Sequence, residues 1–344
     1  MHVWAPAPAH SEGAVTVHEL GAAYRASALH ALDEALDRCP PPRRLFVQWV
    51  PHGYGYKSLN VPFCLWVRKR ARRGDEVYLM VHEPFLAFDR HRVRQNVGAV
   101  VHRVMLRLLL KAASRVWVST PSFLDDVRRF GPRESLDVRW LPIPSPVTPV
   151  HDPAAVEKLR NRLAGKLPLV GYFGTCNSLV APLLQSVFEQ MASRQTSLRV
   201  ALMGRGTRTF ADRLVAAGRI GPAAIVASGE QPAYELSLLL QCCDVFIQPY
   251  PDGVSSRRTT LMALLEHGCA VVASAGPRTE EGWRESDVIV LTSQGDAPAM
   301  AAAALRLLDE PAKRRSMRDR ARTAYITQFD VGHALDVLID GVAV

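Results

Sequence analysis

The sequence has no apolar run of the roughly 20 residues that a membrane-spanning helix needs, and its first residues lack the basic start and apolar stretch of a signal peptide. Its six cysteines form no C-x-x-C pair and have no histidine spacing suited to zinc. No segment carries the complete G-x-G-x-x-G fingerprint of a dinucleotide-binding loop. These absences predict a cytoplasmic protein with buried, reduced thiols, and they argue against a metal site and a nicotinamide cofactor.

What is present is an ordinary globular composition with a basic balance. The chain of 344 residues is 48% hydrophobic and 22% charged, which excludes a disordered or fibrous protein. Its length favours two domains of roughly 150 residues each. The formal net charge of +9 predicts an anionic partner. The candidates are a phosphorylated small molecule, an anionic membrane surface and nucleic acid, and net charge alone does not choose among them.

Short apolar runs alternate with helical stretches along the chain, which is typical of parallel sheets buried on both faces. The first half is predicted to hold strands at 44–50, 77–81 and 115–119, with helices at 60–73 and 93–113. A linker is placed at the Pro-rich residues 141–149, which suit neither a helix nor a central strand. The second half is predicted to hold strands at 167–173, 198–203, 224–226, 245–248 and 270–273, with helices at 180–193, 208–217, 233–241, 259–267, 297–308, 312–328 and 331–342.

This order predicts an α/β protein with two Rossmann-like lobes of parallel sheet that face a central cleft. The lobes are placed at residues 1–145 and 146–330, and a C-terminal helix at 331–344 follows them. Open α/β sheets bind ligands beyond the carboxyl ends of their strands. We therefore expect the site on the loops that follow the strands, facing the cleft.

An anion site is predicted after the strand at 245–248. The loop that follows leads into the helix at 259–267, whose first-turn amides are unpaired donors backed by the helix dipole. Arg257 and Arg258 add two guanidinium groups that suit phosphate geometry. The alternative is a basic turn that is capped for stability only. The residues expected to bind a diphosphate here are Gly253, Ser255, Ser256, Arg257, Arg258, Thr259 and Thr260, with Glu266 as a nearby acid.

Small residues follow two other strands of the second half. Gly174 and Thr175 follow the strand at 167–173, where a backbone would approach a ligand closely. Arg205 lies in a Gly-x-Gly turn after the next strand, which is a weak signal by itself. Gly229 and Glu230 end a further strand, and they suit either contact with a nucleobase or a plain turn.

The first lobe places histidines after two strands. His52 follows the strand at 44–50, and His82 with Glu83 follows the strand at 77–81. A histidine at such a position can orient a substrate hydroxyl or share a proton, because its pKa lies near neutrality. The alternative for each is a structural histidine.

Basic residues recur on the two helical stretches of the first lobe, interleaved with apolar ones. Such a face suits peripheral contact with anionic lipid on the inner side of the membrane, and the alternative is a solvated helical face. These residues are Arg68, Lys69, Arg70, Arg72, Arg73, Arg92, Arg94, Arg103, Arg107, Lys111 and Arg115.

Several motifs of the second half together resemble the donor domain of family four retaining glycosyltransferases, over most of residues 167–330. They are Gly171-Tyr-Phe-Gly-Thr175, Cys243-Asp-Val-Phe-Ile-Gln-Pro-Tyr250, Asp252-Gly-Val-Ser-Ser-Arg-Arg-Thr-Thr-Leu-Met262 and His267-Gly-Cys-Ala-Val-Val-Ala-Ser274. The resemblance implies the GT-B fold, a nucleoside-diphosphate sugar bound as co-substrate in the C-terminal lobe, and an acceptor in the N-terminal lobe. It implies no metal and no other cofactor, and it leaves no role for nucleic acid. His82 matches the family's strand-end histidine beside the donor sugar, with Glu83 and His52 as further catalytic candidates.

The sequence departs from the family's pattern at three places. The family's two glutamates eight residues apart fall on Ser255 and Ala263, which leaves Asp252 and Glu266 as the nearby acids. The Arg and Lys that usually follow the first strand of the donor lobe are missing from residues 175–179. Residues 1–6 look like the family's second strand, so the opening strand is expected to be absent. These departures keep two other functions open, a non-catalytic partner protein with this fold and a nucleotide-sugar epimerase.

Overall fold

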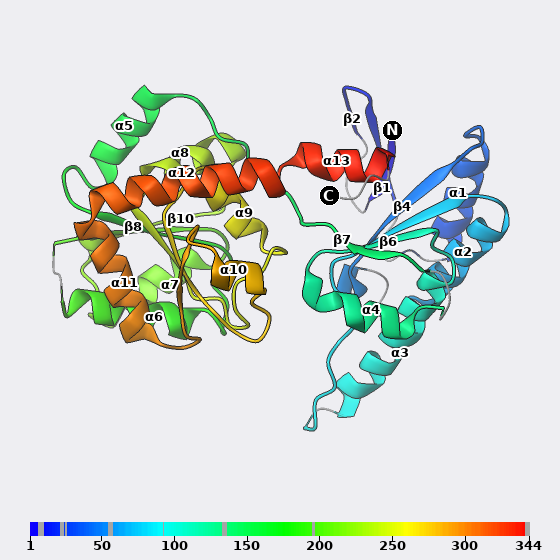
Figure 1. The fold of residues 1–344 in the computed structure, drawn as a ribbon, viewed down its shortest axis with the longest axis horizontal. Helices are drawn as coiled ribbons and strands as arrows, with labels where there is room; N and C mark the ends of the chain where they lie inside the picture. Colours follow the sequence, from blue (N-terminus) through cyan, green and yellow to red (C-terminus); the bar gives the residue numbers. More distant parts are fainter. Residues whose placement is uncertain are drawn as a thin grey trace. The chain divides into compact units, whose positions relative to one another are not determined.

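The structure, a computed structural model, describes the chain except for residues 6–9, 21–23, 25, 54–57, 92, 133–135, 195–196 and 341–344. The chain divides into two compact units, Met1–Leu141 (unit 1) and Pro142–Val344 (unit 2) (Figure 1). Among the described residues, no helix is both long and apolar enough to cross a membrane.

Unit 1 contains two sheets. Its elements are β1 (His2–Ala5), β2 (His10–Glu12), β3 (Val15–Glu19), α1 (Ala26–Asp37), β4 (Arg44–Trp49), η2 (Pro51–Gly53), α2 (Val61–Arg72), β5 (Glu76–Val81), α3 (Val93–Leu110), β6 (Arg115–Val118), η3 (Pro121–Phe123), α4 (Leu124–Phe130) and β7 (Val138–Trp140). Strands β4, β5, β6 and β7 form a parallel sheet in that order. A separate sheet has the order β1-β3-β2, with β1 parallel and β2 antiparallel to β3.

The three strands and two helices predicted for the first half are confirmed as β4, β5, β6, α2 and α3. The strand in residues 1–6 is present as β1, but it pairs with β3 and not with the larger sheet among the described residues. β7 was not predicted, because it is three residues long and exposes Arg139 and Trp140. The core of unit 1 lies where one face of the four-stranded sheet packs against α2, α3 and α4.

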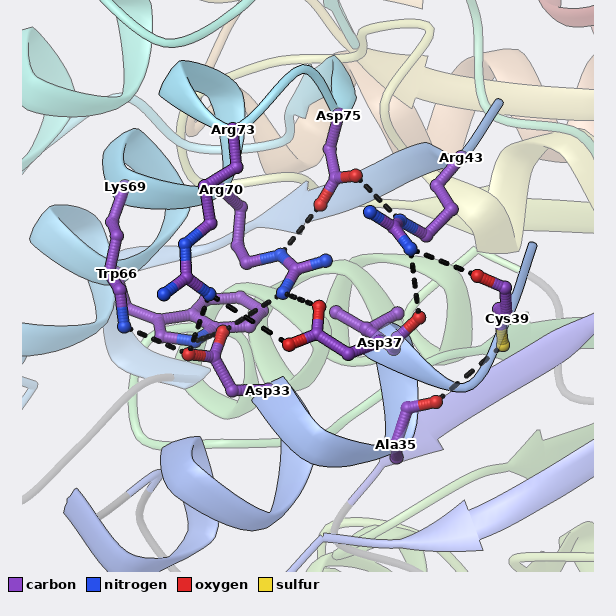
Figure 2. Close-up of polar contacts among 11 residues, drawn as sticks. Asp33, Ala35, Asp37, Cys39, Arg43, Trp66, Lys69, Arg70, Arg73 and Asp75 are labelled. Atoms are coloured by element: carbon purple, nitrogen blue, oxygen red, sulfur yellow. Dashed lines mark hydrogen bonds and ion pairs between the residues drawn. The ribbon is translucent and has the colours of Figure 1, made fainter. Parts of the chain in front are cut away.

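Arg70 of the basic stretch 68–73 is buried among acids, contrary to the prediction of a face for solvent or lipid, whereas Lys69, Arg72 and Arg73 are exposed. Arg70 is fully buried, and its guanidinium contacts Asp75 at 2.6 Å, Asp37 at 2.6 Å and Asp33 at 3.2 Å (Figure 2). Lys69 and Arg73 also pair with Asp33. The reason is tertiary, since α1 supplies two of these carboxylates from more than 30 residues away in sequence.

Unit 2 is built on one six-stranded parallel sheet. Its elements are α5 (Pro153–Leu163), β8 (Leu169–Phe173), α6 (Ala181–Ala192), β9 (Arg199–Met203), α7 (Thr207–Ala216), η4 (Pro222–Ala224), β10 (Ile225–Gly229), α8 (Ala233–Cys242), β11 (Val245–Gln248), α9 (Thr259–Glu266), β12 (Val271–Ser274), α10 (Glu281–Glu285), β13 (Val290–Thr292), α11 (Ala297–Asp309), α12 (Pro311–Gln328) and α13 (Val331–Asp340). The strand order is β10-β9-β8-β11-β12-β13. This is the doubly wound order in which the chain leaves the centre first to one side and then to the other.

Helices cover both faces of this sheet. α6, α7 and α11 pack on one face, and α5, α8, α9 and α12 pack on the other (Figure 1). All five strands predicted for this half are confirmed, whereas α5, α10 and β13 were not predicted. The six cysteines are free thiols as expected, and all except the half-buried Cys39 are buried.

A buried histidine holds the start of unit 2 to its core. His267 is 1% exposed, and its Nδ1 donates to the Ala263 carbonyl at 2.7 Å. Its Nε2 therefore accepts from the Ser237 hydroxyl at 2.9 Å. The Ser237 oxygen accepts in turn from the Val150 amide at 2.8 Å. This network requires a neutral imidazole, since a protonated Nε2 could not accept.

We expect the free energy of unfolding to fall by about 3 kcal/mol between pH 6.5 and 4 on account of His267. Burial lowers the pKa of His267 to about 4. Above pH 6.5 the ring is neutral in both states, and below it the unfolded chain takes up a proton that the folded chain refuses. Urea unfolding across this range should show a smaller pH dependence in His267→Gln than in the wild type. Equal slopes would contradict the assignment.

Candidate functional site

The strand order of unit 2 sets the place for a ligand. β8 and β11 are neighbours at the centre of the sheet, and the chain continues from them to opposite sides. Loops after two such strands diverge and leave a crevice at their carboxyl ends, where α/β sheets bind ligands. Gly174 and Thr175 follow β8, and the loop of residues 249–258 follows β11 and leads into α9.

The loops after β8, β9 and β10 lie backbone against backbone. The Gly174 amide donates to the Met203 carbonyl at 2.9 Å, and the Gly204 amide donates to the Gly229 carbonyl at 2.8 Å. A Cβ at Gly204 would lie 2.4 Å from the Gly174 oxygen, so a side chain does not fit there. The structure thus brings the predicted positions Gly174, Thr175 and Gly229 to one edge of the sheet.

Arg205 and Glu230 contribute exposed side chains at the same edge. Arg205 Nη2 lies 3.3 Å from Glu230 Oε1, and both side chains are about two-thirds or more exposed. An ion pair in that setting contributes little to stability. Both groups are therefore accessible for contact with a ligand.

Replacing Gly204 by alanine should destabilise unit 2 more than the same change at Gly218. Gly204 has φ +111° in addition to the contact with Gly174, whereas Gly218 has φ +64° and open space around it. We expect Gly218→Ala to cost about 1–2 kcal/mol and Gly204→Ala clearly more, because the neighbouring loop must also move. Urea unfolding of both variants measures the difference, and equal losses would show that the close approach is unimportant.

The two arginines predicted before α9, Arg257 and Arg258, both contact one carboxylate, and we call this pair the arginine fork. Asp252 lies 2.8 Å from Arg257 Nη2 and also contacts Arg258, and Arg278 approaches it at 4.0 Å. The Arg258 guanidinium stacks 4.9 Å from the centre of the Tyr250 ring. With Arg278 and the Glu280 carboxylate, which binds Ser256, three arginines face two acids and leave a net positive charge at this loop.

The start of α9 is not capped by a serine or threonine hydroxyl. The N-cap residue is Arg258, and no side chain of the described residues caps the helix. The Ser256 hydroxyl donates to Glu280 at 2.7 Å, and the Thr260 hydroxyl bonds with that of Tyr250 at 3.0 Å. Thr259 is the exposed first residue of the helix. The first-turn amides are therefore open to an anion.

Ser255 adds a second unsatisfied group beside this helix end. Its side chain is 1% exposed, and its hydroxyl has no hydrogen-bond partner among the described residues. A buried hydroxyl without a partner costs free energy that a bound ligand can recover. Gly253, with φ +91°, allows the loop to pass close to the loop after β12, because a Cβ there would lie 2.4 Å from the Gly276 nitrogen.

Glu280 is a site residue that the sequence did not reveal: of the two acids expected nearby, Asp252 lies in this loop and Glu266 does not, and Glu280 is a further acid beside it. Glu280 accepts from the amide and hydroxyl of Ser256 and from Trp283 Nε1 at 2.6 Å. It lies 24 positions from Ser256 in sequence, and the parallel neighbours β11 and β12 bring the two loops together. The available signal was the position of Glu280, an acid that follows the strand predicted at 270–273.

Glu266 is not brought together with these residues. It is the last residue of α9, at the opposite end from Arg258. Burial raises its pKa against hydrogen bonds with Ser145 and Tyr325, which lower it. Its interactions are therefore with the start of unit 2 and α12, and we leave it out of the candidate site.

In unit 1, His82 lies at the carboxyl edge of the four-stranded sheet. Its amide donates to the Trp49 carbonyl at 3.0 Å, and its carbonyl accepts from the Ser119 hydroxyl at 3.2 Å. Its Nε2 donates to Gln48 Oε1 at 2.5 Å. Burial lowers the pKa of His82, which the adjacent Glu83 partly opposes. A neutral ring with Nε2 protonated leaves Nδ1 as a hydrogen-bond acceptor.

His52 lies in η2 and bonds through Nδ1 with the Ser58 hydroxyl at 3.1 Å. Its ring makes an edge contact with His102, 5.7 Å between centres. His102 itself donates from Nε2 to the Ser58 carbonyl at 2.9 Å and accepts the Leu86 amide at 3.4 Å. The loops after β4 and β5 are thus joined through α3. Residues 54–57, between His52 and Ser58, lie outside the described residues.

Among the residues that the structure describes, no cluster of three His, Cys, Asp or Glu side chains could hold a metal ion. That the chemistry needs no metal and no further cofactor stays a prediction.

Comparison with known proteins identifies the fold. Residues 167–310 match the family described as glycosyl transferases group 1, which confirms the resemblance noted from the motifs. Sucrose-phosphate synthase from Thermosynechococcus elongatus superimposes with a TM-score of 0.72 at 16% identity, over 99% of this chain and 89% of its own. Anabaena HepE, in complex with UDP and glucose, gives a TM-score of 0.66 at 14% identity, over 95% and 85%.

A third solved structure is the α,α-trehalose-phosphate synthase (UDP-forming) of Burkholderia xenovorans with glucose-6-phosphate. Its TM-score is 0.67 at 15% identity, over 97% of this chain and 88% of its own. No curated protein sequence is significantly similar to the chain. At these identities the likeness shows the fold, which is GT-B as the motifs predicted.

Proposed function

We propose that this chain, whose second unit carries a domain of the glycosyl transferases group 1 family, transfers a hexosyl group from a nucleoside-diphosphate sugar to an acceptor hydroxyl with retention. The observation that carries the proposal is the open N-terminus of α9 beside Arg257, Arg258 and the unpartnered Ser255 hydroxyl. This helix start follows β11, one of the two central strands of a doubly wound sheet. The UDP complexes solved for HepE support a nucleoside diphosphate as the ligand class.

In this proposal the diphosphate is held by two kinds of donor, backbone amides and guanidinium groups. The first-turn amides of α9 and the helix dipole favour a negative group at this end. The guanidinium groups of Arg257 and Arg258 supply charge-assisted hydrogen bonds. Asp252 keeps the two arginines side by side in the free protein, and an incoming phosphate shares or displaces that carboxylate.

The same groups would assist the reaction. The bond between the sugar carbon and the diphosphate oxygen breaks, and its electron pair remains on the diphosphate. The acceptor oxygen bonds to the same carbon from the face of departure, and its proton passes to the departing phosphate. Donors fixed where negative charge develops lower the barrier by several kcal/mol. His82 would bind the sugar through its ring.

The first experiment is a thermal-shift panel of nucleoside diphosphates and nucleoside-diphosphate sugars. A ligand at 100 times its dissociation constant stabilises the folded state by about 2.7 kcal/mol. Product analysis with the best donor then tests the reaction. Transfer or donor hydrolysis supports the proposal, binding without turnover indicates a non-catalytic partner protein, and an epimerised free sugar nucleotide indicates an epimerase.

We expect Arg257→Met and Arg258→Met each to weaken binding of the nucleoside diphosphate by about 1.5–3 kcal/mol, the value of one charge-assisted hydrogen bond. Calorimetric titration measures the change. Arg219→Met is the matched control, because Arg219 is an exposed arginine of unit 2 paired with Glu189. Unchanged affinity in both fork variants would rule out the anion site.

A further inference from the structure

Exposed apolar side chains lie in a stripe on α3 of unit 1. Val97 is 61% exposed, Val100 52% and Val104 49%. Their spacing of three and four residues places them on one face of the helix. Phe88, in the loop before α3, is 58% exposed. We call Phe88, Val97, Val100 and Val104 the α3 surface.

The loop that carries Phe88 is fixed to α3 by polar contacts. The Asn96 side chain accepts from the Asp89 amide at 2.8 Å and donates to the Asp89 carbonyl at 2.9 Å. The Arg103 guanidinium stacks on the rings of Phe85 at 4.0 Å and Phe88 at 4.1 Å. Figure 1 shows the start of α3 and the loop before it projecting beyond the four-stranded sheet. Phe88 is therefore held outward beside the helix.

Positive charge predominates around this surface, although Asp126 of α4 acts electrostatically on the Arg103 guanidinium. From Pro84 to Leu124 the chain has a single acid, Asp89, and its carboxylate accepts the amide of His91 at 2.8 Å. The stripe on α3 continues at the same spacing into the exposed Arg107 and Lys111. The same stretch has seven basic residues, which are Arg90, Arg92, Arg94, Arg103, Arg107, Lys111 and Arg115.

We propose that the α3 surface docks unit 1 onto an anionic bilayer. Apolar side chains on a projecting helix enter the boundary between headgroups and acyl chains, and flanking cations contact the anionic headgroups. A second copy of the chain is a poorer occupant, because α3 packed on α3 would oppose Arg107 and Lys111 to one another without acids to pair them. Phe88 follows His82 by six residues, so docking holds that strand end within roughly 20 Å of the headgroups.

The test is co-sedimentation of the full chain with vesicles of phosphatidylcholine alone or mixed with phosphatidylglycerol. We expect binding to the mixed vesicles that weakens at high salt. Val100→Asp with Val104→Asp should reduce partitioning at least about tenfold, and Arg107→Gln and Lys111→Gln about fivefold each. Ile326→Asp is the control, since Ile326 is 56% exposed on α12 of unit 2. Circular dichroism confirms that each variant is folded.

The readout is binding to vesicles, so it succeeds or fails independently of sugar transfer. Lack of binding to the mixed vesicles overturns the proposal. Equal loss in Ile326→Asp overturns it as well, because the α3 surface would then have no special role. A wild-type dimer in light scattering that the Val100→Asp and Val104→Asp double variant converts to a monomer would assign the surface to a second copy instead.

Discussion

Asp75→Asn is expected to lower the free energy of unfolding of unit 1 by about 3 kcal/mol or more. The Asp75 side chain is 2% exposed and contacts two cations, Arg70 at 2.6 Å and Arg43 at 2.7 Å (Figure 2). Arg70 is fully buried, and one of its terminal nitrogens has no partner among the described residues. Removing the shared anion leaves two neighbouring cations undercompensated in the interior, where water cannot screen them.

The adjacent ion pair provides the control for this prediction. Glu76 pairs with Arg44 at 3.0 Å one residue further along, but these side chains are 41% and 47% exposed. Glu76→Gln should therefore cost less than about 1 kcal/mol. Urea unfolding followed by tryptophan fluorescence compares the two. In the double variant Asp75→Asn with Arg70→Met the loss should be partly restored, because fewer unpaired charges remain. Equal small losses in both single variants would show that the buried network is not stabilising.

The sequence predicted the sheet of unit 2 well because its strands are short apolar runs separated by helices of ordinary length. The strands β8, β9, β11 and β12 are almost wholly buried, so their composition alone distinguishes them, whereas the edge strand β10 is partly exposed in its middle. α5 was missed although Asp152 and Pro153 are a good helix start, since the Pro-rich passage beside it favours a linker. β7 was missed because three residues, of which one is buried and two are exposed, leave no such pattern.

The site was predictable where the signal is local and unpredictable where two distant segments meet. Arg257, Arg258 and the start of α9 are neighbours in sequence, so their association could be predicted. The engagement of Ser256 with Glu280 depends on the pairing of β11 with β12, which no local pattern gives. Likewise, residues 68–73 have the basic composition of a solvated helical face. Only the packing of α1 against α2 shows that Arg70 is buried.

Loss of the His82 ring is expected to reduce the rate of sugar transfer by about 10²–10⁴ in His82→Ala, with little change in binding of the nucleoside diphosphate. This prediction rests on the proposed function. His82 belongs to unit 1, and the groups assigned to the diphosphate all belong to unit 2, so the substitution leaves that binding site intact. A contact that strengthens as charge develops at the reacting carbon lowers the barrier more than it tightens binding.

Initial-rate kinetics and calorimetry of the same variant separate these effects. His30→Ala is the matched control, because His30 is an exposed histidine of α1 that pairs with Glu34. Gln48→Ala removes the acceptor of the His82 Nε2–H bond at 2.5 Å and should lower kcat less than loss of the ring does. If His82→Ala keeps its kcat but loses nucleotide affinity, the roles assigned to the two units are reversed. If it keeps both, the Gln48 contact and the carboxyl-edge position of His82 serve the fold of unit 1 alone.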